Sequence, residues 1–460
     1  MAAGIKNKTK FWNMLDSLEG DKIIWMIVFF LITFSILAVS SSTSLLAMQL
    51  KSSRMSIAME QMVMAVAGMG IIVCCSKVGK IGVFRFLSRY GFLVSFLMLA
   101  FLASHFQGIG FIRPMNLNKA WRCISVFGFQ LHVFEFVKVF MAMYIAWAMD
   151  ALKTGRTALA DKLAKKPHLG FMARQEAKVC FYVIIPILVT TGLIALGSNS
   201  SAMFICLVMV VTAIVGGLDI KFILALILLG CVGVGGIWGT YKMSGGRVFE
   251  RFGLIFDRLH LASADPLERL HQYKPGTLEF QQVLDETMQP VSAKVAISEG
   301  GILGKGPGNS TQRYVVSVMY EDYMYSFIIE EYGFLGAIFI LMLYGSLLAR
   351  GSIIIRNCDN HYAKTLIAGL VLLVSGQALM HILINVDLFP LTGQTLPMVS
   401  HGNSSFLAFS IVFGVILSVS KMARKKIAQE AAAAEPVFVK SDDDVKDGLD
   451  DLDRMESGAE

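Results

Sequence analysis

The sequence predicts an all-α membrane protein that crosses the bilayer about ten times. Three observations support this fold class: 55% of the 460 residues are hydrophobic, only 16% are charged, and apolar runs of helical length recur along the chain. A soluble domain typically has about 25% charged residues, and a membrane-spanning helix needs about 20 apolar ones. The formal net charge of +7 is explained by basic cytoplasmic loops and does not indicate nucleic-acid binding.

Each candidate span begins where an apolar run begins. The ten spans start near Ile23, Ile57, Phe92, Val133, Val179, Ala202, Phe222, Phe327, Leu366 and Phe406. The first run is long and lacks a small-residue cleavage site, so we expect it to remain as a signal anchor. We therefore expect a cytoplasmic N-terminus over residues 1–21 and a transmembrane domain over residues 22–426.

Basic residues in short loops predict the orientation, because cytoplasmic loops are enriched in lysine and arginine. They occur before span one, in loops 2–3, 4–5 and 8–9, and after span ten. They include Lys6, Lys8, Lys10, Lys22, Lys77, Lys80, Arg85, Arg89, Lys153, Arg156, Lys162, Arg350, Arg356, Lys421 and Arg424. Loops 5–6 and 9–10 have none, so we expect both termini in the cytoplasm. Loop 3–4 is an exception, because Arg113, Lys119 and Arg122 would lie outside.

Two further patterns concern the tail and the cysteines. Residues 427–460 begin with an alanine-rich stretch and become acidic and poor in aromatic residues, which predicts a disordered cytoplasmic tail. The seven cysteines lie mostly within or beside spans and form no CxxC pair. This pattern favours small packing residues over a disulfide framework or a zinc site.

One long external segment, residues 241–313, separates spans seven and eight, and residues 249–261 within it are amphipathic. A segment of this length is usually functional or forms a re-entrant lid, and a passive connector is the alternative. Its end, residues 297–313, reads I-S-E-G-G-I-L-G-K-G-P-G-N-S-T-Q-R. The glycines, with Lys305 and Arg313, suggest a phosphate-binding nest, although the pattern is not a P-loop.

Carboxylates at the start of span eight are the strongest candidates for chemistry. Asp322 comes just before Phe327, where the span begins at the external interface. A partly desolvated carboxylate there has a raised pKa and can act as a general base; an ordinary interfacial charge is the alternative. Glu330 and Glu331 lie deeper in the same span. Neighbouring helical residues point about 100° apart, so separate structural pairing is the alternative to a functional role.

Two other regions combine polar residues with apolar spans. Glu135 and Lys138 begin span four and share a helix face at a spacing of three, which favours an intrahelical pair. Alternatively, Lys138 neutralises a phosphate and Glu135 positions it. The last external loop, residues 385–405, is rich in proline and polar residues, which favours either substrate lining or turn formation. Its candidate lining residues are Asn385, Thr392, Ser400 and Ser404.

Four stretches resemble the SEDS family (shape, elongation, division and sporulation). They are residues 296–313, residues 322–333 (D-Y-M-Y-S-F-I-I-E-E-Y-G), residues 377–386 (Q-A-L-M-H-I-L-I-N-V) and residues 389–405 (F-P-L-T-G-Q-T-L-P-M-V-S-H-G-N-S-S). The ending I-L-S-V-S-K before the basic tail is most similar to the cell-division branch, in its Bacteroidetes form. The resemblance covers nearly the whole chain, including the ten spans and the long loop after span seven.

The resemblance implies a peptidoglycan glycosyltransferase of the inner membrane. Such enzymes polymerise lipid II, an undecaprenyl-pyrophosphate-linked disaccharide-pentapeptide, outside the membrane at the division septum. The family's essential aspartate matches Asp322, its Glu-x-x-Lys pair matches Glu135 and Lys138, and its Gly-Lys-Gly loop matches residues 304–306. The implied partners are a class B penicillin-binding transpeptidase, other divisome proteins and membrane lipid.

The implied reaction needs a base and a cation. Asp322 would remove the proton from the acceptor hydroxyl, and cationic groups would stabilise the lipid-pyrophosphate leaving group. The candidate cations are Lys138, Lys294, Lys305 and Arg313. A divalent ion such as Mg²⁺ or Mn²⁺ is the alternative, and no ligand cluster in the sequence decides between them.

The chain departs from the family pattern at several positions. His132, Val133 and Phe134 stand where the family usually has Gln, Pro and Ser; Ser292 replaces a Gln, and Asn403 a Gly. Other functions compatible with the sequence are a lipid II flippase or transporter and a division scaffold. A flippase is expected to have charged residues along a route from the cytoplasmic side, whereas the distinctive polar residues here gather at the external face.

Overall fold

The computed structural model describes residues 19–104, 112–117, 120–126, 129–243, 277–316, 318–389 and 393–434. In these residues, long helical segments occur at the ten expected positions. They are α2 (Lys22–Ser42), α4 (Arg54–Ser76), α5 (Ile81–Ala103), α6 (Val133–Thr154), α8 (Gln175–Val179) continued by α9 (Ile185–Ala195), α10 (Asn199–Val215), α11 (Ile220–Met243), α15 (Met324–Arg356), α16 (His361–Asn385) and α17 (Asn403–Ala434). The expected all-α, multi-pass fold is confirmed.

Eight helical segments in the described part of the chain are long and apolar enough to cross a membrane. α10 is shorter, with 17 residues, and α6 has charged residues at both of its ends. Both helices are nevertheless central: α6 is mostly buried and contacts α5, α10 and α16. Charged residues are tolerated in α6 because protein, and not lipid, surrounds them.

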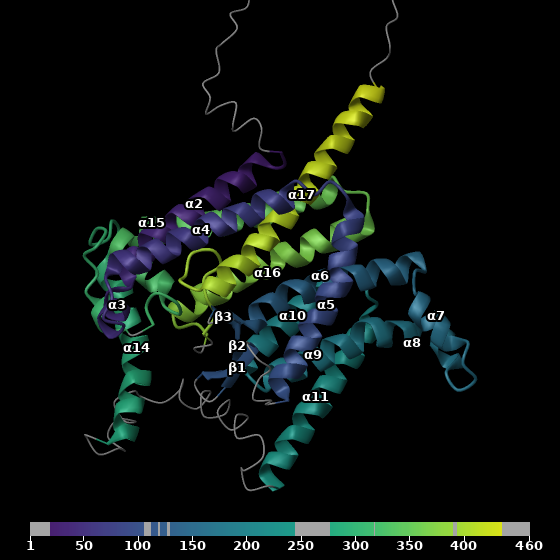
Figure 1. Cartoon of the computed structure of the whole chain (residues 1–460), viewed down its shortest axis with the longest axis horizontal. Coiled ribbons are helices and arrows are strands. Elements are labelled where there is room, and N and C mark those ends of the chain that lie inside the picture. The colour runs from purple at the N-terminus through teal and green to yellow at the C-terminus, as the bar shows by residue number, and fades with distance from the viewer. Residues whose placement is uncertain are drawn as a thin grey trace, which may run out of the picture.

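The helices form two hydrophobic cores that meet where α16 packs against α6 and α10. One core is built mainly by α2, α4, α15, α16 and α17, and the other by α5, α6, α9 and α10. Figure 1 shows these groups side by side, with α16 close to α6. At Gly369 of α16 an added Cβ would lie 2.8 Å from the Thr212 side chain of α10. A glycine there therefore allows the two helices to approach closely.

The start of α2 and the end of α17 lie together. Asp21 caps α2 by accepting a hydrogen bond from Ile23 N at 2.9 Å, and it also accepts one from Arg350 Nε of α15 at 3.0 Å. Arg424 of α17 donates to the Gly20 carbonyl at 2.8 Å. Both elements lie at the upper side of Figure 1, whereas the start of α15 lies at the other end of the bundle.

A small antiparallel sheet replaces the simple external loop expected between spans three and four. Its strands are β1 (Ile112–Leu117), β2 (Ala120–Val126) and β3 (Phe129–His132), in the order β1-β2-β3. Ser404, near the start of α17, joins this sheet to the bundle, because its Oγ accepts from His132 N at 3.0 Å and donates to Gln130 O at 3.1 Å. The sheet thus ends directly at α6, which carries Glu135 and Lys138.

Some element boundaries differ from the sequence predictions. α5 begins at Ile81, well before Phe92, and its Arg85 forms an ion pair with Asp150 of α6 at 3.0 Å. This pairing lets an arginine assigned to a loop lie inside a helix of the bundle. The alanine-rich residues 427–434, expected to begin the disordered tail, continue α17, because alanine has the highest helix propensity. Residues 435–460 lie outside the described residues.

The expected external segment is partly helical. α11 continues to Met243, and α14 (Leu278–Gly300) occupies the second half of the segment, with Pro290 inside it. The amphipathic stretch at residues 249–261 lies outside the described residues. In Figure 1, α14 extends away from the bundle near the start of α15.

The glycine-rich loop after α14 pairs with a break in α15 at Gly333, where φ is +68°. Phe334 N donates to Gly301 O at 2.9 Å, and Gly306 N donates to Glu331 O at 2.9 Å. A Cβ at Gly333 would lie 2.2 Å from Ile302 O. Only glycine therefore fits both the backbone angle and the approach of the two segments.

We expect Gly333→Ala to destabilise the protein by about 3 kcal/mol, because a positive φ is combined with a backbone overlap. Gly345→Ala is the matched control, since a Cβ at Gly345 of the same helix meets nothing within 4 Å. Thermal unfolding of both variants in detergent tests this. Equal melting midpoints for the two variants would contradict the role of Gly333.

Candidate active site

Asp322 lies in the turn immediately before α15, and its side chain is half-buried. Its backbone is held on both sides: Asp322 N donates to Val318 O at 3.0 Å, and Asn385 Nδ2 donates to Asp322 O at 3.0 Å. Within the described residues its carboxylate has no hydrogen-bond or ion-pair partner, and only the more distant charge of Arg122 acts on it. Gly393 faces this carboxylate, because a Cβ there would lie 3.6 Å from Oδ2.

Burial changes the acidity of this turn. It raises the pKa of Asp322 from 3.8 to about 6, against the opposing effect of Arg122. The neighbouring Glu321 is also half-buried, and this burial together with the charge of Asp322 raises its pKa to about 8. At neutral pH the Asp322 carboxylate is thus mostly ionised while Glu321 is mostly protonated. A base with a pKa just below the working pH is well suited to proton transfer.

Lys138 is a buried cation near the start of α6, and only 1% of its surface is exposed. Its Nζ lies 2.7 Å from Glu135 Oε1, 2.8 Å from Gln377 Oε1 and 3.3 Å from Gln394 Oε1. The expected pair with Glu135 is therefore present, and two glutamines complete the surroundings. Three acceptors match the three protons of an ammonium group, which lowers the cost of burying the charge.

One face of α16 connects Lys138 with the turn of Asp322. Gln377, His381 and Asn385 follow at intervals of four residues, so their side chains share that face. His381 bonds through Nδ1 to Gln394 O at 2.7 Å and accepts at Nε2 from Tyr325 N at 3.3 Å. Asn385 is the only one of the three that we predicted as a site residue. The missed signal was the four-residue spacing of polar groups in an apolar span.

Two other residues predicted in the last external loop, Ser400 and Ser404, form hydrogen bonds to backbone atoms of neighbouring segments. Ser400 Oγ donates to Glu321 O at 2.8 Å and accepts from Leu396 N at 2.9 Å, so it fixes the turn beside Asp322. Ser404 holds the sheet against α17, as described above. Thr392 lies outside the described residues.

Lys305 belongs to a second cluster, around the fully buried Glu330 of α15. Its Nζ lies 2.8 Å from Glu330 Oε1 and 2.8 Å from Thr311 Oγ1, and it also pairs with Glu299. Ser310 Oγ and Thr311 N donate to the same Glu330 carboxylate at 2.5 and 2.8 Å. The lysine of the glycine-rich loop thus neutralises a buried carboxylate.

Glu331 has a separate set of partners, as expected for neighbouring helical residues. Its Oε1 accepts from Ser41 Oγ at 2.5 Å and from Gly308 N at 3.0 Å, and it lies 3.8 Å from Arg313 Nη1. Arg313 also donates to Ser41 Oγ at 3.0 Å. The glycine-loop amide expected to face a phosphate therefore faces a carboxylate of the protein.

Lys294 lies on α14, with about half of its side chain exposed, and its Nζ is 2.5 Å from Asp387 Oδ2. This ion pair joins α14 to the last external loop at the surface. The structure therefore distributes the four predicted cations among three places: Lys138 with Glu135, Lys305 and Arg313 around Glu330 and Glu331, and Lys294 at the surface.

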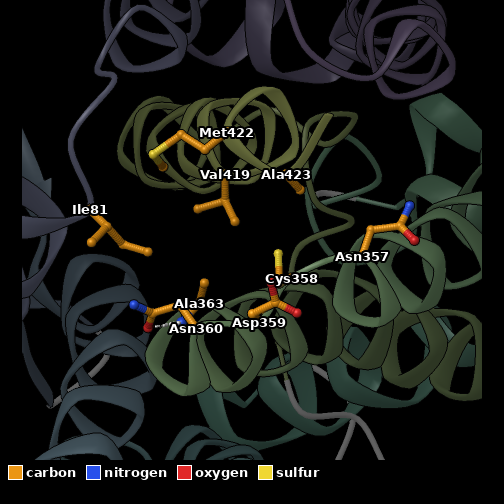
Figure 2. A pocket seen from close by; sticks show the side chains of 9 residues that line it. All are labelled: Ile81, Asn357, Cys358, Asp359, Asn360, Ala363, Val419, Met422 and Ala423. Atoms are coloured by element: carbon orange, nitrogen blue, oxygen red, sulfur yellow. Dashed lines mark hydrogen bonds between the residues drawn. The ribbon is translucent and has the colours of Figure 1, made fainter. Parts of the chain in front are cut away.

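Neither a metal-ligand set in the described residues nor the cavity shown in Figure 2 coincides with Asp322. Among the described residues, no three His, Cys, Asp or Glu side chains are grouped as metal ligands. The cavity in Figure 2 has a volume of about 370 Å³, and its lining includes Asn357, Asp359, Asn360, Val419 and Met422. These residues lie between the end of α15 and the start of α16, and near the end of α17. The cavity is thus at the opposite end of the bundle from Asp322.

We expect Lys305→Met to destabilise the protein by about 3 kcal/mol, because it leaves the buried Glu330 carboxylate without its cation. Adding Glu330→Gln should restore most of the loss. Lys294→Met is the matched control, since its exposed ion pair contributes less than about 1 kcal/mol. Thermal unfolding measures all three, and equal losses in the two lysine variants would contradict the structural role of Lys305.

We expect Asp322→Asn to stabilise the protein at pH 7.5. A raised carboxyl pKa means that the folded state binds more protons between pH 4 and 6, so wild-type stability falls as the pH rises through that window. The shift corresponds to roughly 3 kcal/mol well above pH 6. Melting midpoints should therefore favour the variant at pH 7.5 and nearly coincide at pH 4. A less stable variant at pH 7.5 would mean that the carboxylate makes a stabilising contact.

Two relatives with similar sequences are named as a peptidoglycan glycosyltransferase and as a sporulation protein. A probable peptidoglycan glycosyltransferase FtsW of Caulobacter vibrioides is 27% identical over 71% of this chain and 71% of its own. The stage V sporulation protein E of Bacillus subtilis is 24% identical over 88% of this chain and 98% of its own.

Solved structures share the fold. A chain of a peptidoglycan synthase complex that coordinates polymerization and crosslinking matches with a TM-score of 0.59 and 18% identity, covering 88% of this chain and 98% of its own. The rod shape determining protein RodA of Thermus thermophilus matches with a TM-score of 0.52 and 17% identity, over the same shares of the two chains. The family model described as cell cycle protein, which unites FtsW, RodA and SpoVE, matches residues 21–425. Because this match covers almost the whole helical bundle, the chain belongs to the FtsW/RodA/SpoVE family, the SEDS proteins.

Proposed function

We propose that this protein is a peptidoglycan glycosyltransferase that polymerises lipid II, with Asp322 as the general base. The observation that carries the proposal is the Asp322 carboxylate itself. It is half-buried, it has no hydrogen-bond or ion-pair partner among the described residues, and its pKa is about 6. The names of the FtsW relatives support the reaction class.

The base acts on the acceptor sugar. As the acceptor hydroxyl oxygen bonds to the anomeric carbon of the donor, its proton passes to Asp322. The bond from that carbon to the pyrophosphate oxygen breaks, and both electrons leave with the lipid pyrophosphate. The proton later passes from Asp322 to solvent. General base catalysis of this kind contributes roughly 10²–10⁴-fold to a rate.

The leaving group gains negative charge, and Lys138 is the cation that we assign to it. Its burial makes the attraction to a pyrophosphate oxygen stronger than it would be in water. Glu135 orients Lys138, while Lys305 and Arg313 position the glycine-rich loop through Glu330 and Glu331. Asn385 and Ser400 hold the Asp322 turn, and Ser404 holds the sheet. We also assign Lys294 of α14 and Thr392 of the loop after α16 to substrate binding.

We further infer that the chain is an inner-membrane protein of the division septum, with residues 22–426 as its transmembrane domain and both termini cytoplasmic. The adjacent start of α2 and end of α17, opposite Asp322, support placing both termini on one side of the membrane. The partners we assign are a class B penicillin-binding transpeptidase and other divisome proteins. The related chain in a peptidoglycan synthase complex supports the first of these.

We expect Asp322→Asn to reduce lipid II polymerisation at least 100-fold, because the amide cannot accept the proton. Proteoliposomes with the partner transpeptidase, at equal protein abundance and equal partner binding, give the measurement. The wild-type rate should rise with pH through about 6, as Asp322 ionises.

Asp387→Asn is the matched control for this experiment, because Asp387 is an exposed carboxylate in the last external loop. It should retain wild-type glycan length. Long strands from both the Asp322 variant and the wild type would remove Asp322 as the base and direct attention to Glu135, Glu330 or Glu331. The absence of strands from the wild type would refute polymerisation, and lipid II translocation would be assayed next.

A further inference from the structure

Lys138 has no proton left to offer a ligand. Its ammonium group has three, and the acceptors Glu135, Gln377 and Gln394 lie at 2.7, 2.8 and 3.3 Å. Lys138, Gln377 and Gln394 are buried and the Glu135 side chain is 17% exposed, so little water reaches the ammonium group. A pyrophosphate oxygen can therefore bind Lys138 only if one of the three acceptors leaves.

Two of the acceptors are firmly held. Glu135 is a carboxylate on the same helix face as Lys138, and charge-assisted bonds are about twice as strong as neutral ones. Gln377 lies inside α16, and its amide group is fixed by bonds from Nε2 to Thr395 O at 3.0 Å and Thr395 Oγ1 at 3.3 Å. Gln377 cannot move without breaking several hydrogen bonds, and Glu135 cannot move without breaking its charge-assisted bond to Lys138.

Gln394 is the acceptor that can leave. Its hydrogen bond to Lys138 is the longest of the three. The Gln394 side chain is uncharged, and the residue lies in the loop between α16 and α17. Its Nε2 donates to Ser201 Oγ at 3.0 Å, so the side chain retains one partner on α10 after release.

The Gln394 backbone is held independently of its side chain. Tyr325 N donates to His381 Nε2, so His381 carries its proton on Nδ1 and donates it to Gln394 O at 2.7 Å. This bond fixes the loop against α16 and α15. Rotation of the Gln394 side chain therefore requires no movement of the loop that also contains Gly393, beside Asp322.

We propose that Gln394 is an exchangeable ligand of Lys138. In the empty site its neutral amide accepts a hydrogen bond from the ammonium group, and on binding a pyrophosphate oxygen of the donor replaces it. The inference rests on the proposed function and adds a residue that sets the affinity of the leaving-group site. In the empty site Gln394 stabilises the buried cation. On donor binding it competes with the substrate, so its removal strengthens binding.

Three variants of the full-length chain test the exchange. Gln394→Met keeps the side-chain length but removes the amide acceptor, and should bind the pyrophosphate about fivefold more tightly, the size of one ordinary hydrogen bond. Gln394→Glu places a second carboxylate on Lys138 and should weaken binding at least tenfold. Gln377→Met, the matched control, removes an acceptor inside α16 but leaves Gln394 on the ammonium, so it should not strengthen binding.

The measurement is binding of undecaprenyl pyrophosphate to each protein in lipid nanodiscs, with undecaprenol as the probe that lacks the anion. Undecaprenol affinity should be the same for all variants. In parallel, Gln394→Met should lower the KM for lipid II with kcat changed less than twofold. This division between KM and kcat separates exchange from general damage to the site.

The outcomes are distinguishable from failure of the proposed function. A wild type that polymerises lipid II, with Gln394→Met binding undecaprenyl pyrophosphate no more tightly than wild type, overturns the exchange alone. The same holds if Gln394→Glu binds as well as wild type. A wild type that neither polymerises lipid II nor distinguishes the pyrophosphate from the alcohol overturns the proposed function and the exchange together.

Discussion

The pairing of buried charges inside an apolar bundle is the constraint on which the rest of this structure depends. Lys138 pairs with Glu135, Lys305 with Glu330, and Arg85 with Asp150. An unpaired charge in such surroundings is costly, so the contacts of these charges restrict how the helices pack. Arg85–Asp150 joins α5 to α6, Lys305–Glu330 joins the glycine-rich loop to α15, and Lys138, paired within α6, contacts α16 through Gln377.

Against this background Asp322 is unusual. The carboxylates of Asp150, Glu330 and Glu331 have a cation or several donors, whereas the Asp322 side chain has only the distant influence of Arg122. Its backbone, in contrast, is fixed by Val318 and Asn385. The fold thus holds a poorly solvated carboxylate in a defined position and leaves its oxygens available. That combination raises its basicity, at a cost in stability that the paired charges elsewhere offset.

Among the described residues, the glycine-rich loop contacts α15 and not the Asp322 side chain. Its amides and its lysine face Glu330 and Glu331, and its backbone pairs with α15 at Gly333. The loop therefore ties α14 and the α2–α3 junction, where α3 spans Ser44–Gln49, to the helix that begins just after Asp322. These contacts fix the first turns of that helix in place.

The sequence by itself determined the features that depend on local order. Apolar runs predicted the ten helical segments, and the three-residue spacing predicted the Glu135–Lys138 pair. The position of Asp322 before an apolar run predicted a carboxylate just before the start of a helix. Family resemblance added the reaction. These signals are short in range, because helix length, helix face and the cost of a charge in an apolar run are local properties.

Only the tertiary structure decided which distant groups meet. Nothing local indicated that Glu331 would accept from Ser41 or that Gln394 would reach Lys138, because these contacts join residues hundreds of positions apart. The sheet at residues 112–132 and α14 were also missed. Polar side chains in a span each have several possible partners, and the packing of the helices selects one of them.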